Sequence, residues 1–275
     1  MLVVIRGAGD LATGIALRLH RAGYQIVMTD LPAPTSIRRT VCFSEAIRLG
    51  EMTVEDISAR KVETPEEALT LAQSGVVAVL ADPAGACIPT LRPGAVVDAI
   101  LAKKNLGTAL VDAPVVIGVG PGFTVGIDCH AAVETMRGHT LGRALYTGSP
   151  LPNTGIPGLI GGRSGERVLR APADGIFEPR MEIGPLVQEG EIAATVNGKP
   201  MRCTITGCLG ACSRRLTGPR GHEMRRHRPT GPAGQLLYCL RQGHRHRRRR
   251  TGGTPPLRMP AGLTFTVDIS PYFPV

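Results

Sequence analysis

Hydrophobic and polar positions alternate between two patterns along the first 120 residues. Short apolar runs, typical of buried parallel strands, cover Leu2–Ile5, Gln25–Asp30, Val76–Leu80, Ala95–Leu101 and Val115–Val119. Apolar residues at helical spacing predict helices over Asp10–Arg21 and Pro65–Gln73. The rest of 41–73 is mixed, and glycine is dense between 118 and 165, where we expect mostly loop. Strands that alternate with helices predict an α/β fold with a Rossmann-like, doubly wound parallel sheet.

The pattern changes near Arg167 to short β segments with regular turns. Segments 170–177, 183–190 and 192–196 resemble the first half of a biotinyl/lipoyl-type barrel-sandwich domain, and 201–207 would begin its second half. We therefore predict three parts. They are a Rossmann-like nucleotide-binding domain (1–165), a small, partial barrel-sandwich-like β domain (166–207) and an Arg/Pro/Gly-rich tail (208–275).

Composition changes this picture mainly at the tail. The net charge of +10 suggests a nucleic-acid partner, but residues 1–207 hold 19 Lys and Arg against 20 Asp and Glu, so the excess lies in 208–275. Few apolar periodicities and like-charge repulsion predict that this tail is disordered. No apolar run is long enough to span a membrane, and the seven cysteines are scattered. These features predict a cytoplasmic protein without a membrane partner.

A glycine turn follows the first predicted strand. Gly7 to Ala12 matches G-x-G-x-x-[G/A], and such a turn places a pyrophosphate at the N-terminus of the next helix. Asp30 ends the second strand, where a carboxylate can bind a ribose hydroxyl and would repel the 2′-phosphate of NADP. Asp10 either caps the helix or contacts a ligand or metal. We take Gly7, Gly9, Asp10, Thr13 and Asp30 as candidate cofactor-binding residues.

Further candidates follow later strands, because ligands of open α/β sheets bind at the carboxyl ends of the strands. Arg38 and Arg39 either grip a phosphate or form a solvated pair. The others are the cations and amide of one loop and the glycines of a second loop: Lys103, Lys104, Asn105, Gly118, Gly120 and Gly122. No metal-ligand spacing is present, and the sequence identifies no catalytic residue.

Seven motifs occur in order over about residues 1–207: RGAGDLATG, RRTVCFSEA, LAKKNLGT, GPGF, ETMRGHTLGR, NTGIPG and RVLRAPADG. Together they resemble the YqeB-type accessory proteins of selenium-dependent molybdenum hydroxylases. The resemblance implies a bacterial helper in molybdenum cofactor insertion or selenation, with a hydroxylase client and no firmly assigned chemistry. It leaves open whether the protein is an enzyme, and favours a non-catalytic maturation factor. The ligand would be NAD or a molybdenum cofactor dinucleotide, and a homo-oligomer stays open.

The resemblance ends near Gly207. Residues 243–249, back-translated with GC-rich codons and read one base later, spell Ala-Ile-Ala-Ile-Gly-Gly, which is part of the family's continuation. We interpret the tail as a frameshift near residue 209, which resequencing of the gene would test.

Two other functions compete. The glycine turn alone is compatible with an NAD-dependent oxidoreductase, although no acid–base group stands out for hydride transfer. The arginine run 245–250 alone suggests a nucleic-acid-binding protein. Nucleic acid is not the expected partner, because no aromatic platform or recognition helix accompanies that run.

Overall fold

The computed structural model describes residues 1–156, 162–212, 216–218 and 223–228. Within them the chain is a mixed α/β protein with one large sheet of nine strands. These strands are β1 (Leu2–Arg6), β2 (Gln25–Thr29), β3 (Glu51–Val54), β4 (Ile57–Val62), β5 (Val77–Leu80), β6 (Ala95–Asp98), β7 (Val116–Val119), β8 (Ala131–Val133) and β9 (Ala144–Leu145). Their order is β3-β4-β5-β2-β1-β6-β7-β8-β9. The pairs from β4 to β8 are parallel, and β3 and β9 are antiparallel edges.

Helices cover both faces of this sheet. They are α1 (Asp10–Arg21), α2 (Glu45–Leu49), α3 (Pro65–Gln73) and α4 (Ile88–Leu91), with 3-10 turns at Arg39–Val41, Leu110–Asp112 and Gly165–Arg167. Val3 and Ile5 of β1 lie in one apolar cluster with α1 and α2. Leu2 and Val4 point to the other face, into a second cluster with α3 and α4. Each central strand is thus buried on both sides, which explains its uninterrupted apolar run.

The two long helices have the predicted bounds, and local signals account for their ends. Thr64 caps α3 by accepting a hydrogen bond from the Glu67 amide (3.2 Å), and Pro65 occupies the first turn, where it loses no bond. Gly23, with φ +87°, ends α1 in the left-handed conformation that favours glycine. The hairpin β3–β4 lies in the region that the sequence left mixed.

The segment after Ser164 forms a β-rich region of two four-stranded sheets within the described residues. Its strands are β10 (Val168–Arg170), β11 (Gly175–Pro179), β12 (Leu186–Val187), β13 (Ile192–Val196), β14 (Lys199–Arg202), β15 (Gly207–Cys212), β16 (Leu216–Gly218) and β17 (Glu223–Arg228). The sheets β10-β17-β15-β12 and β14-β13-β11-β16 enclose one core, to which Leu169, Phe177, Val187, Met201 and Leu209 contribute.

The prediction of disorder from residue 208 is wrong for three described segments. β15, β16 and β17, at 207–212, 216–218 and 223–228, pair with β12, β11 and β10, so they belong to the two sheets. Pairing with strands that already bury an apolar face outweighs their poor periodicity. The rest of the predicted tail, including the arginine run 245–250 and the residues behind the frameshift hypothesis, lies outside the described residues.

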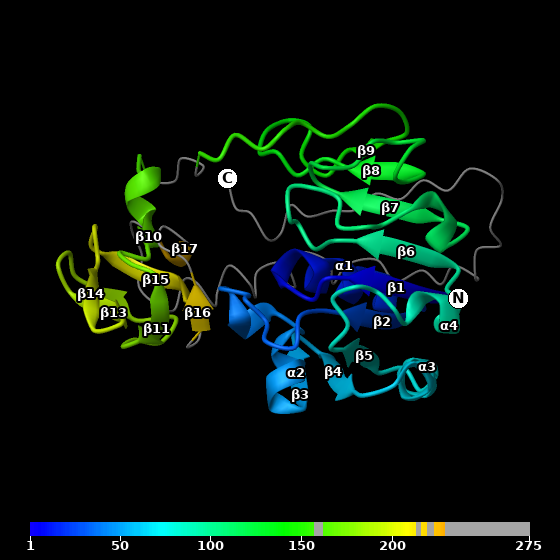
Figure 1. The fold of residues 1–275 in the computed structure, drawn as a ribbon, viewed down its shortest axis with the longest axis horizontal. Helices are drawn as coiled ribbons and strands as arrows, with labels where there is room; N and C mark the ends of the chain where they lie inside the picture. Colours follow the sequence, from blue (N-terminus) through cyan, green and yellow to red (C-terminus); the bar gives the residue numbers. More distant parts are fainter. Residues whose placement is uncertain (157–161, 213–215, 219–222, 229–275) are drawn as a thin grey trace, which may run out of the picture.

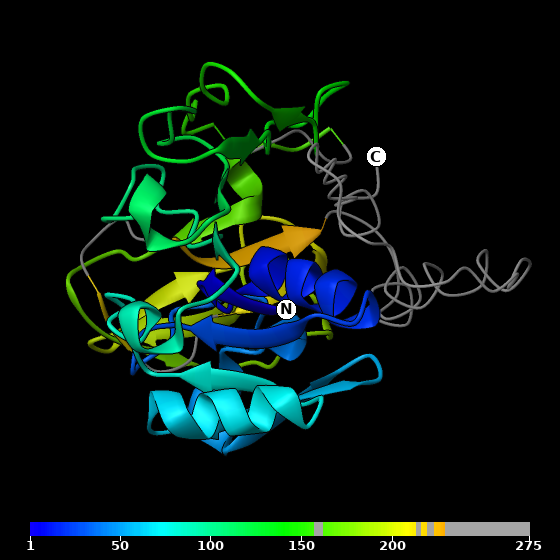
Figure 2. The same cartoon turned by 90° about the vertical axis from the view of Figure 1, so that its right-hand side faces the viewer.

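The β-rich region lies beside the large sheet, on the side toward which the arrowheads of β6 and β7 point (Figure 1). Seen from the opposite end, its strands lie behind α1 and β1 (Figure 2). An ion pair joins the two parts, since Arg39 Nη2 lies 2.5 Å from Glu182 Oε2. The carboxyl ends of the parallel strands therefore face the β-rich region.

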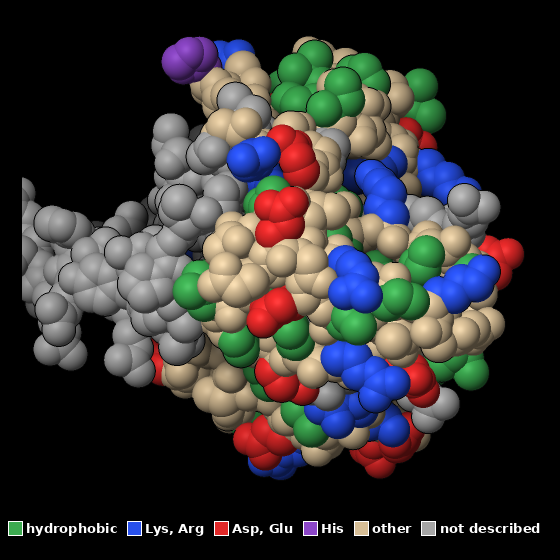
Figure 3. Space-filling view, turned by 90° about the vertical axis from the view of Figure 1, so that its left-hand side faces the viewer, with side chains coloured by type: hydrophobic (Ala, Val, Ile, Leu, Met, Phe, Trp, Pro, Cys, Tyr) green, Lys and Arg blue, Asp and Glu red, His purple; other side chains and the backbone are tan. Residues whose placement is uncertain are grey.

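In the part of the chain that the structure describes, none of the helices is both long and apolar enough to cross a membrane. On the face that carries the β-rich region, Lys and Arg side chains are interspersed with Asp and Glu (Figure 3).

Candidate functional site

A cavity of about 460 Å³ lies at the carboxyl ends of β1, β2, β5 and β6, and we call it the crevice. Its walls come from Gly7 and 9–12 after β1, 29–31 at the end of β2, 35–37, Pro83 after β5, and 99–101 with Leu106 after β6. In sheet order, β2 and β5 lie on one side of β1, and β6 and β7 lie on the other. The crevice thus opens where the strand order reverses, the usual place for ligands in open α/β sheets.

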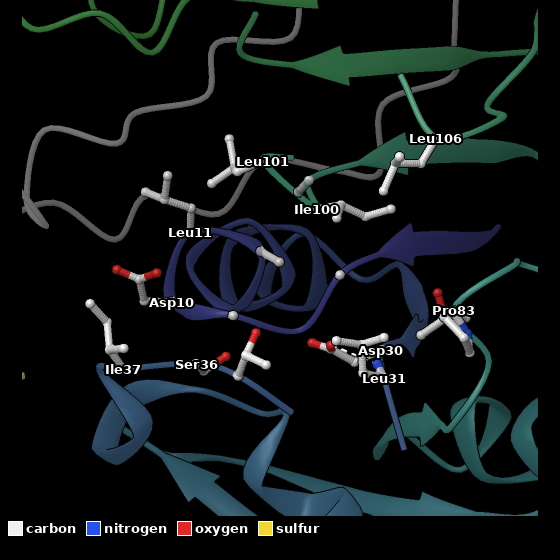
Figure 4. Close-up of a pocket in the computed structure, with 16 residues that line it drawn as sticks. Asp10, Leu11, Asp30, Leu31, Ser36, Ile37, Pro83, Ile100, Leu101 and Leu106 are labelled. Atoms are coloured by element: carbon white, nitrogen blue, oxygen red, sulfur yellow. Dashed lines mark hydrogen bonds between the residues drawn. The ribbon is translucent and has the colours of Figure 1, made fainter. Parts of the chain in front are cut away.

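The side chains that line the crevice lie on two sides of the glycine turn. Ile100, Leu101 and Leu106 form an apolar wall on one side, and Asp30 and Ser36 lie on the other side together with the apolar Leu31 and Ile37 (Figure 4). A largely apolar ligand with a few polar groups would fit such a lining.

The two glycines of the turn have different roles. Gly7 has φ +95°, and a Cβ there would lie 2.8 Å from the Ala99 carbonyl oxygen, so the fold itself requires glycine. A Cβ at Gly9 would meet only Ser36 Oγ, at 3.5 Å, which is ordinary contact. The packing of the protein does not explain Gly9, but close approach of a ligand to its backbone would.

The N-terminus of α1 opens into the crevice without a side-chain cap. Gly9 is the N-cap residue, and no side chain accepts a hydrogen bond from the first amides of the helix. Asp10, Leu11 and Ala12 line the cavity, so the N–H groups of this first turn border it. Uncapped amides and the positive end of the helix dipole favour an anion there.

The Asp30 carboxylate accepts hydrogen bonds from two backbone amides at the crevice. Its Oδ2 accepts a hydrogen bond from the Ala8 amide (2.8 Å), and its Oδ1 accepts one from the Leu31 amide (2.7 Å). Burial raises the pKa of this carboxyl above its usual value, and the two amide bonds act against that shift. Each oxygen keeps a second lone pair, so the carboxylate that shapes the turn can also accept a ligand hydroxyl.

Asp10 does not cap its own helix. Its carboxylate forms an ion pair with Arg38, with both side chains partly exposed beside the mouth of the crevice. A carboxylate at this point opposes a phosphate, whereas the guanidinium beside it attracts one. The two residues therefore set the charge at the helix N-terminus together.

A buried arginine lies beneath the turn. Arg6 is 2% exposed, and its guanidinium donates to the Thr108 hydroxyl and to the Leu106 carbonyl (3.2 Å). Thr108 Oγ1 in turn donates to Asp98 Oδ2 (2.6 Å), and Asp98 is also only 2% exposed. This network holds the loop after β6 against the end of β1. The sequence analysis missed it, although an arginine inside an apolar strand was a visible signal.

Two predicted site residues are structural instead. Thr13 is buried, and its hydroxyl accepts a hydrogen bond from the Phe43 amide (2.9 Å) and donates to the Ala8 carbonyl (3.3 Å). Arg39 is 5% exposed and pairs with Glu182. Neither lines the crevice. Arg38 and Arg39 thus pair with different carboxylates in this structure, Asp10 and Glu182.

The later candidates lie outside the crevice. Asn105 Nδ2 donates to the Thr108 carbonyl (2.8 Å) and to Asp128 Oδ1 (3.0 Å), which stabilises its own loop. Gly118, Gly120, Gly122 and Lys104 are not among the residues that line the crevice or a second, smaller cleft next to it; the glycines let other atoms approach their backbones closely. Lys103 lines that smaller cleft.

The described residues contain no group of three or more His, Cys, Asp or Glu that could hold a metal ion. Residues that the sequence analysis did not single out complete the crevice, among them Ser36, Pro83, Ala99 and Ile100. Ala99 directly follows β6, and Pro83 lies three residues after the end of β5; a place just after a strand was the signal that could have identified them.

Comparison with known proteins supports the likeness to YqeB and does not bear on the hydroxylase role. The chain is 50% identical over 208 residues to a protein of Escherichia coli strain K12 described as "Uncharacterized protein YqeB". The match covers 76% of this chain and 38% of that protein, so the chain spans less than half of the relative's length. No protein-family model matches the chain.

Among solved structures, the chain is similar to an aspartoacylase family protein from Mesorhizobium loti. The identity is 12%, the match covers 84% of this chain and 85% of that one, and the TM-score is 0.29. This likeness is too weak to carry an argument about fold or chemistry.

Proposed function

We propose that this relative of YqeB is an accessory protein that binds a nucleotide or dinucleotide in the crevice and serves the maturation of a selenium-dependent molybdenum hydroxylase. The observation that carries the binding half is the uncapped N-terminus of α1 beside Gly9 and Asp30, at the reversal point of a parallel sheet. The maturation half rests on the resemblance carried by the seven ordered motifs, and the 50% identical relative supports the YqeB likeness alone.

The strand order supports a Rossmann-like reading of the sheet. Six parallel strands lie in the order β5-β2-β1-β6-β7-β8. When they are numbered 1 to 6 along the chain, without the hairpin β3–β4, they give the 3-2-1-4-5-6 order of dinucleotide-binding folds. The β-rich region, with its two sheets around one core, is compatible with a barrel-sandwich domain. We read it as a packing domain, since Lys199 lies beside Asn197-Gly198 without the neighbours of a carrier lysine.

In the proposed complex, the pyrophosphate lies against Gly9 and the first amides of α1, and a ribose hydroxyl donates to Asp30. Arg38 exchanges its contact with Asp10 for one with a phosphate oxygen, because a charge-assisted bond to phosphate compensates for the lost ion pair. The carboxylates of Asp10 and Asp30 disfavour a second phosphate at the ribose, so NAD or a molybdenum cofactor dinucleotide is preferred to NADP.

The crevice gives less support to the oxidoreductase alternative. Hydride transfer to a carbonyl or hydroxyl substrate needs a general acid or base near the nicotinamide. The ionisable side chains that line the described crevice are Asp10, which is ion-paired, and Asp30, which is bonded to two backbone amides. We therefore assign the protein a binding role, with the hydroxylase as its partner.

Calorimetric titration with NAD and with cytidine nucleotides tests the binding half. Asp30→Asn should weaken binding about tenfold or more, because a hydrogen bond to a charged group contributes about 1.5–3 kcal/mol. Asp112→Asn is the matched control: its carboxylate also accepts a backbone amide, from Ala109, but lies outside the crevice. Equal affinities in both variants, or no binding to the parent protein, would contradict the proposal.

The Asp10–Arg38 pair adds a second test, in which two substitutions should change the ligand affinity in opposite directions. Arg38→Gln removes the cation and should weaken binding of the phosphorylated ligand. Asp10→Asn removes the opposing carboxylate and its ion pair with Arg38, so it should strengthen binding. A ligand whose phosphate lies elsewhere would respond to neither substitution.

The maturation half needs a cellular readout. In a host lacking the gene, the purified hydroxylase should lack selenium or molybdenum by elemental analysis, and the parent gene should restore it. The gene with Asp30→Asn should restore less. A hydroxylase that carries both elements in the deletion strain would overturn this half.

A further inference from the structure

A second cavity lies at the same edge of the sheet, on the other side of the loop that follows β6. This cleft has a volume of about 180 Å³, and it lies beyond the carboxyl ends of β6, β7 and β8. The polar and charged side chains that line it are Lys103, Thr135, Arg137, Asn153 and Thr154.

The loop between the two cavities holds two residues in the left-handed conformation. Leu101 has φ +61° and Lys103 has φ +65°, and neither is glycine. Leu101 lines the crevice, and Lys103 lines the cleft. Strained non-glycine residues of this kind cluster at ligand-binding segments, where the surrounding structure maintains them. The loop thus contributes one residue with left-handed backbone to each cavity.

Close backbone packing maintains that loop conformation. A Cβ at Gly122 would lie 2.5 Å from the Lys104 Cα, and a Cβ at Gly120 would lie 2.9 Å from the Thr135 hydroxyl. Both glycines also have positive φ, at +110° and +84°. The loop that contains Gly120 and Gly122 therefore packs against the loop that contains Lys103 and Lys104 and against Thr135 in one wall of the cleft.

A buried carboxylate joins the opposite walls. Glu134 is 3% exposed, and it accepts hydrogen bonds from the amides of Met136 (2.6 Å) and Leu151 (2.8 Å), which both line the cleft. Because both oxygens hold a backbone amide, the walls are fixed before any ligand arrives. The charge of Glu134 opposes an anion, but two cations, Lys103 and Arg137, face the cleft against it.

We propose that this cleft is a second binding site, for a phosphate or phosphomonoester group. Its lining offers an ammonium, a guanidinium, two hydroxyls and an amide, and no carboxylate is among the described residues that line it. Ammonium and guanidinium groups form the strongest hydrogen bonds to phosphate oxygens. A water molecule occupies about 30 Å³ in the liquid, so the cleft has room for a phosphate and part of its substituent.

The proposal does not depend on a nucleotide in the crevice. Backbone amide spectra of the full chain, titrated with inorganic phosphate and then with a simple sugar phosphate, locate the site directly. We expect saturable shifts at Thr135, Arg137, Asn153 and Thr154. Shifts confined to residues 9–12, or no saturable shifts, would overturn it.

Neighbouring lysines provide a matched pair of variants. Lys103→Gln should weaken phosphate binding at the cleft about tenfold, since it removes one charge-assisted bond. Lys104→Gln, one residue away with the same change of charge, should leave it within about twofold, because Lys104 is not among the residues that line the cleft. Equal losses in both would mean unspecific charge attraction, and would contradict a built site. Arg137→Gln checks the opposite wall and should also weaken binding.

Both lysine variants should bind NAD as the parent does. Loss of phosphate shifts together with unchanged NAD binding would support the cleft alone. Loss of NAD binding in Asp30→Asn with unchanged phosphate shifts would test the crevice alone, so the two proposals can fail separately.

Discussion

The two halves of the sheet's carboxyl edge present different chemical groups to an anion. In the crevice half, the helix α1 follows β1 directly, so backbone amides and the helix dipole are available to an anion. In the cleft half, no α-helix connects β6 to β7 or β7 to β8 in the described chain; the first connection holds a 3-10 turn and the second is loop. Side chains such as Lys103 and Arg137 take the place of the helix there.

The kind of connection between parallel strands, helix or loop, thus determines which donor groups lie at the edge of the sheet. A helical crossover provides uncharged donors whose positions depend on glycine, as at Gly7 and Gly9. A loop crossover provides charged donors such as Lys103. Their positions depend on left-handed backbone and on buried carboxylates, such as Glu134, that accept hydrogen bonds from the backbone. The first kind can be read from a sequence motif. The second depends on packing between distant segments.

Arg6 holds the loop between the crevice and the cleft, so its loss should have the largest effect on stability and on binding at both cavities. Arg6→Ala leaves the buried Asp98 carboxylate without its cation and releases the loop that separates the crevice from the cleft. Breaking a buried ion pair from one side costs about 3–5 kcal/mol. Urea unfolding should show a loss of that size, and both NAD and phosphate binding should fall.

The control for Arg6 is an exposed pair. Arg60→Ala removes an arginine that lies 3.8 Å from Glu51 with both side chains more than half exposed, and it should cost less than about 1 kcal/mol. If Arg6→Ala cost no more than Arg60→Ala, the buried network would not support the edge.

Gly7→Ala should damage the crevice half alone. Alanine at positive φ costs about 1–2 kcal/mol, and here its Cβ would also collide with the Ala99 carbonyl. Gly23→Ala has similar φ but open space around its Cβ, so it measures the conformational cost by itself. We expect Gly7→Ala to exceed Gly23→Ala by about 1–3 kcal/mol in unfolding experiments. Phosphate shifts at the cleft should persist at temperatures where the variant stays folded.

The pH dependence of NAD affinity should report Asp30. Burial raises its pKa, so the carboxylate is lost at a higher pH than for an ordinary aspartate. Below that raised pKa, the affinity should fall as the pH decreases and level off near that of Asp30→Asn, because the neutral carboxyl is a weaker acceptor for the ligand hydroxyl. Titrations of parent and Asp30→Asn proteins between pH 7 and 4 measure the difference. Parallel curves would show that this carboxylate does not contact the ligand.

The contact between the large sheet and the β-rich region should have the smallest effect. Glu182→Gln neutralises an acidic side chain that is 76% exposed and pairs with Arg39. Such a pair contributes less than about 1 kcal/mol, and the loss should shrink further at high salt. A larger loss in urea unfolding, insensitive to salt, would show that the two parts depend on this contact far more than its exposure indicates.

Much of the crevice half could be predicted from the sequence. The bounds of α1 and α3, the central apolar strands, the glycine turn and Asp30 all follow from local signals: period, caps and residue type. The hairpin β3–β4 was missed because charged residues hide its period: Glu51 lies in the edge strand β3, and Arg60 and Lys61 lie in β4 beside it.

The cleft half could be predicted only as a list of candidates. The sequence places Lys103 and Lys104 side by side, and only the left-handed backbone at Lys103 decides which one faces the cavity. Arg39 likewise looked equivalent to Arg38 until the fold buried it against Glu182. These distinctions depend on contacts between distant segments, which no local pattern encodes.

The central position of β1 has a consequence for folding. It pairs with β2 about 23 residues later along the chain (Leu2 with Gln25) and with β6 about 92 residues later (Val3 with Ala95). Closing the shorter loop costs less entropy, so β1, α1 and β2 can associate early, and the segment from Ala95 onward joins last. The glycine turn would then exist before its apolar wall. A folding intermediate with a protected β1–β2 pair and an open crevice should appear in pulse-labelling hydrogen exchange.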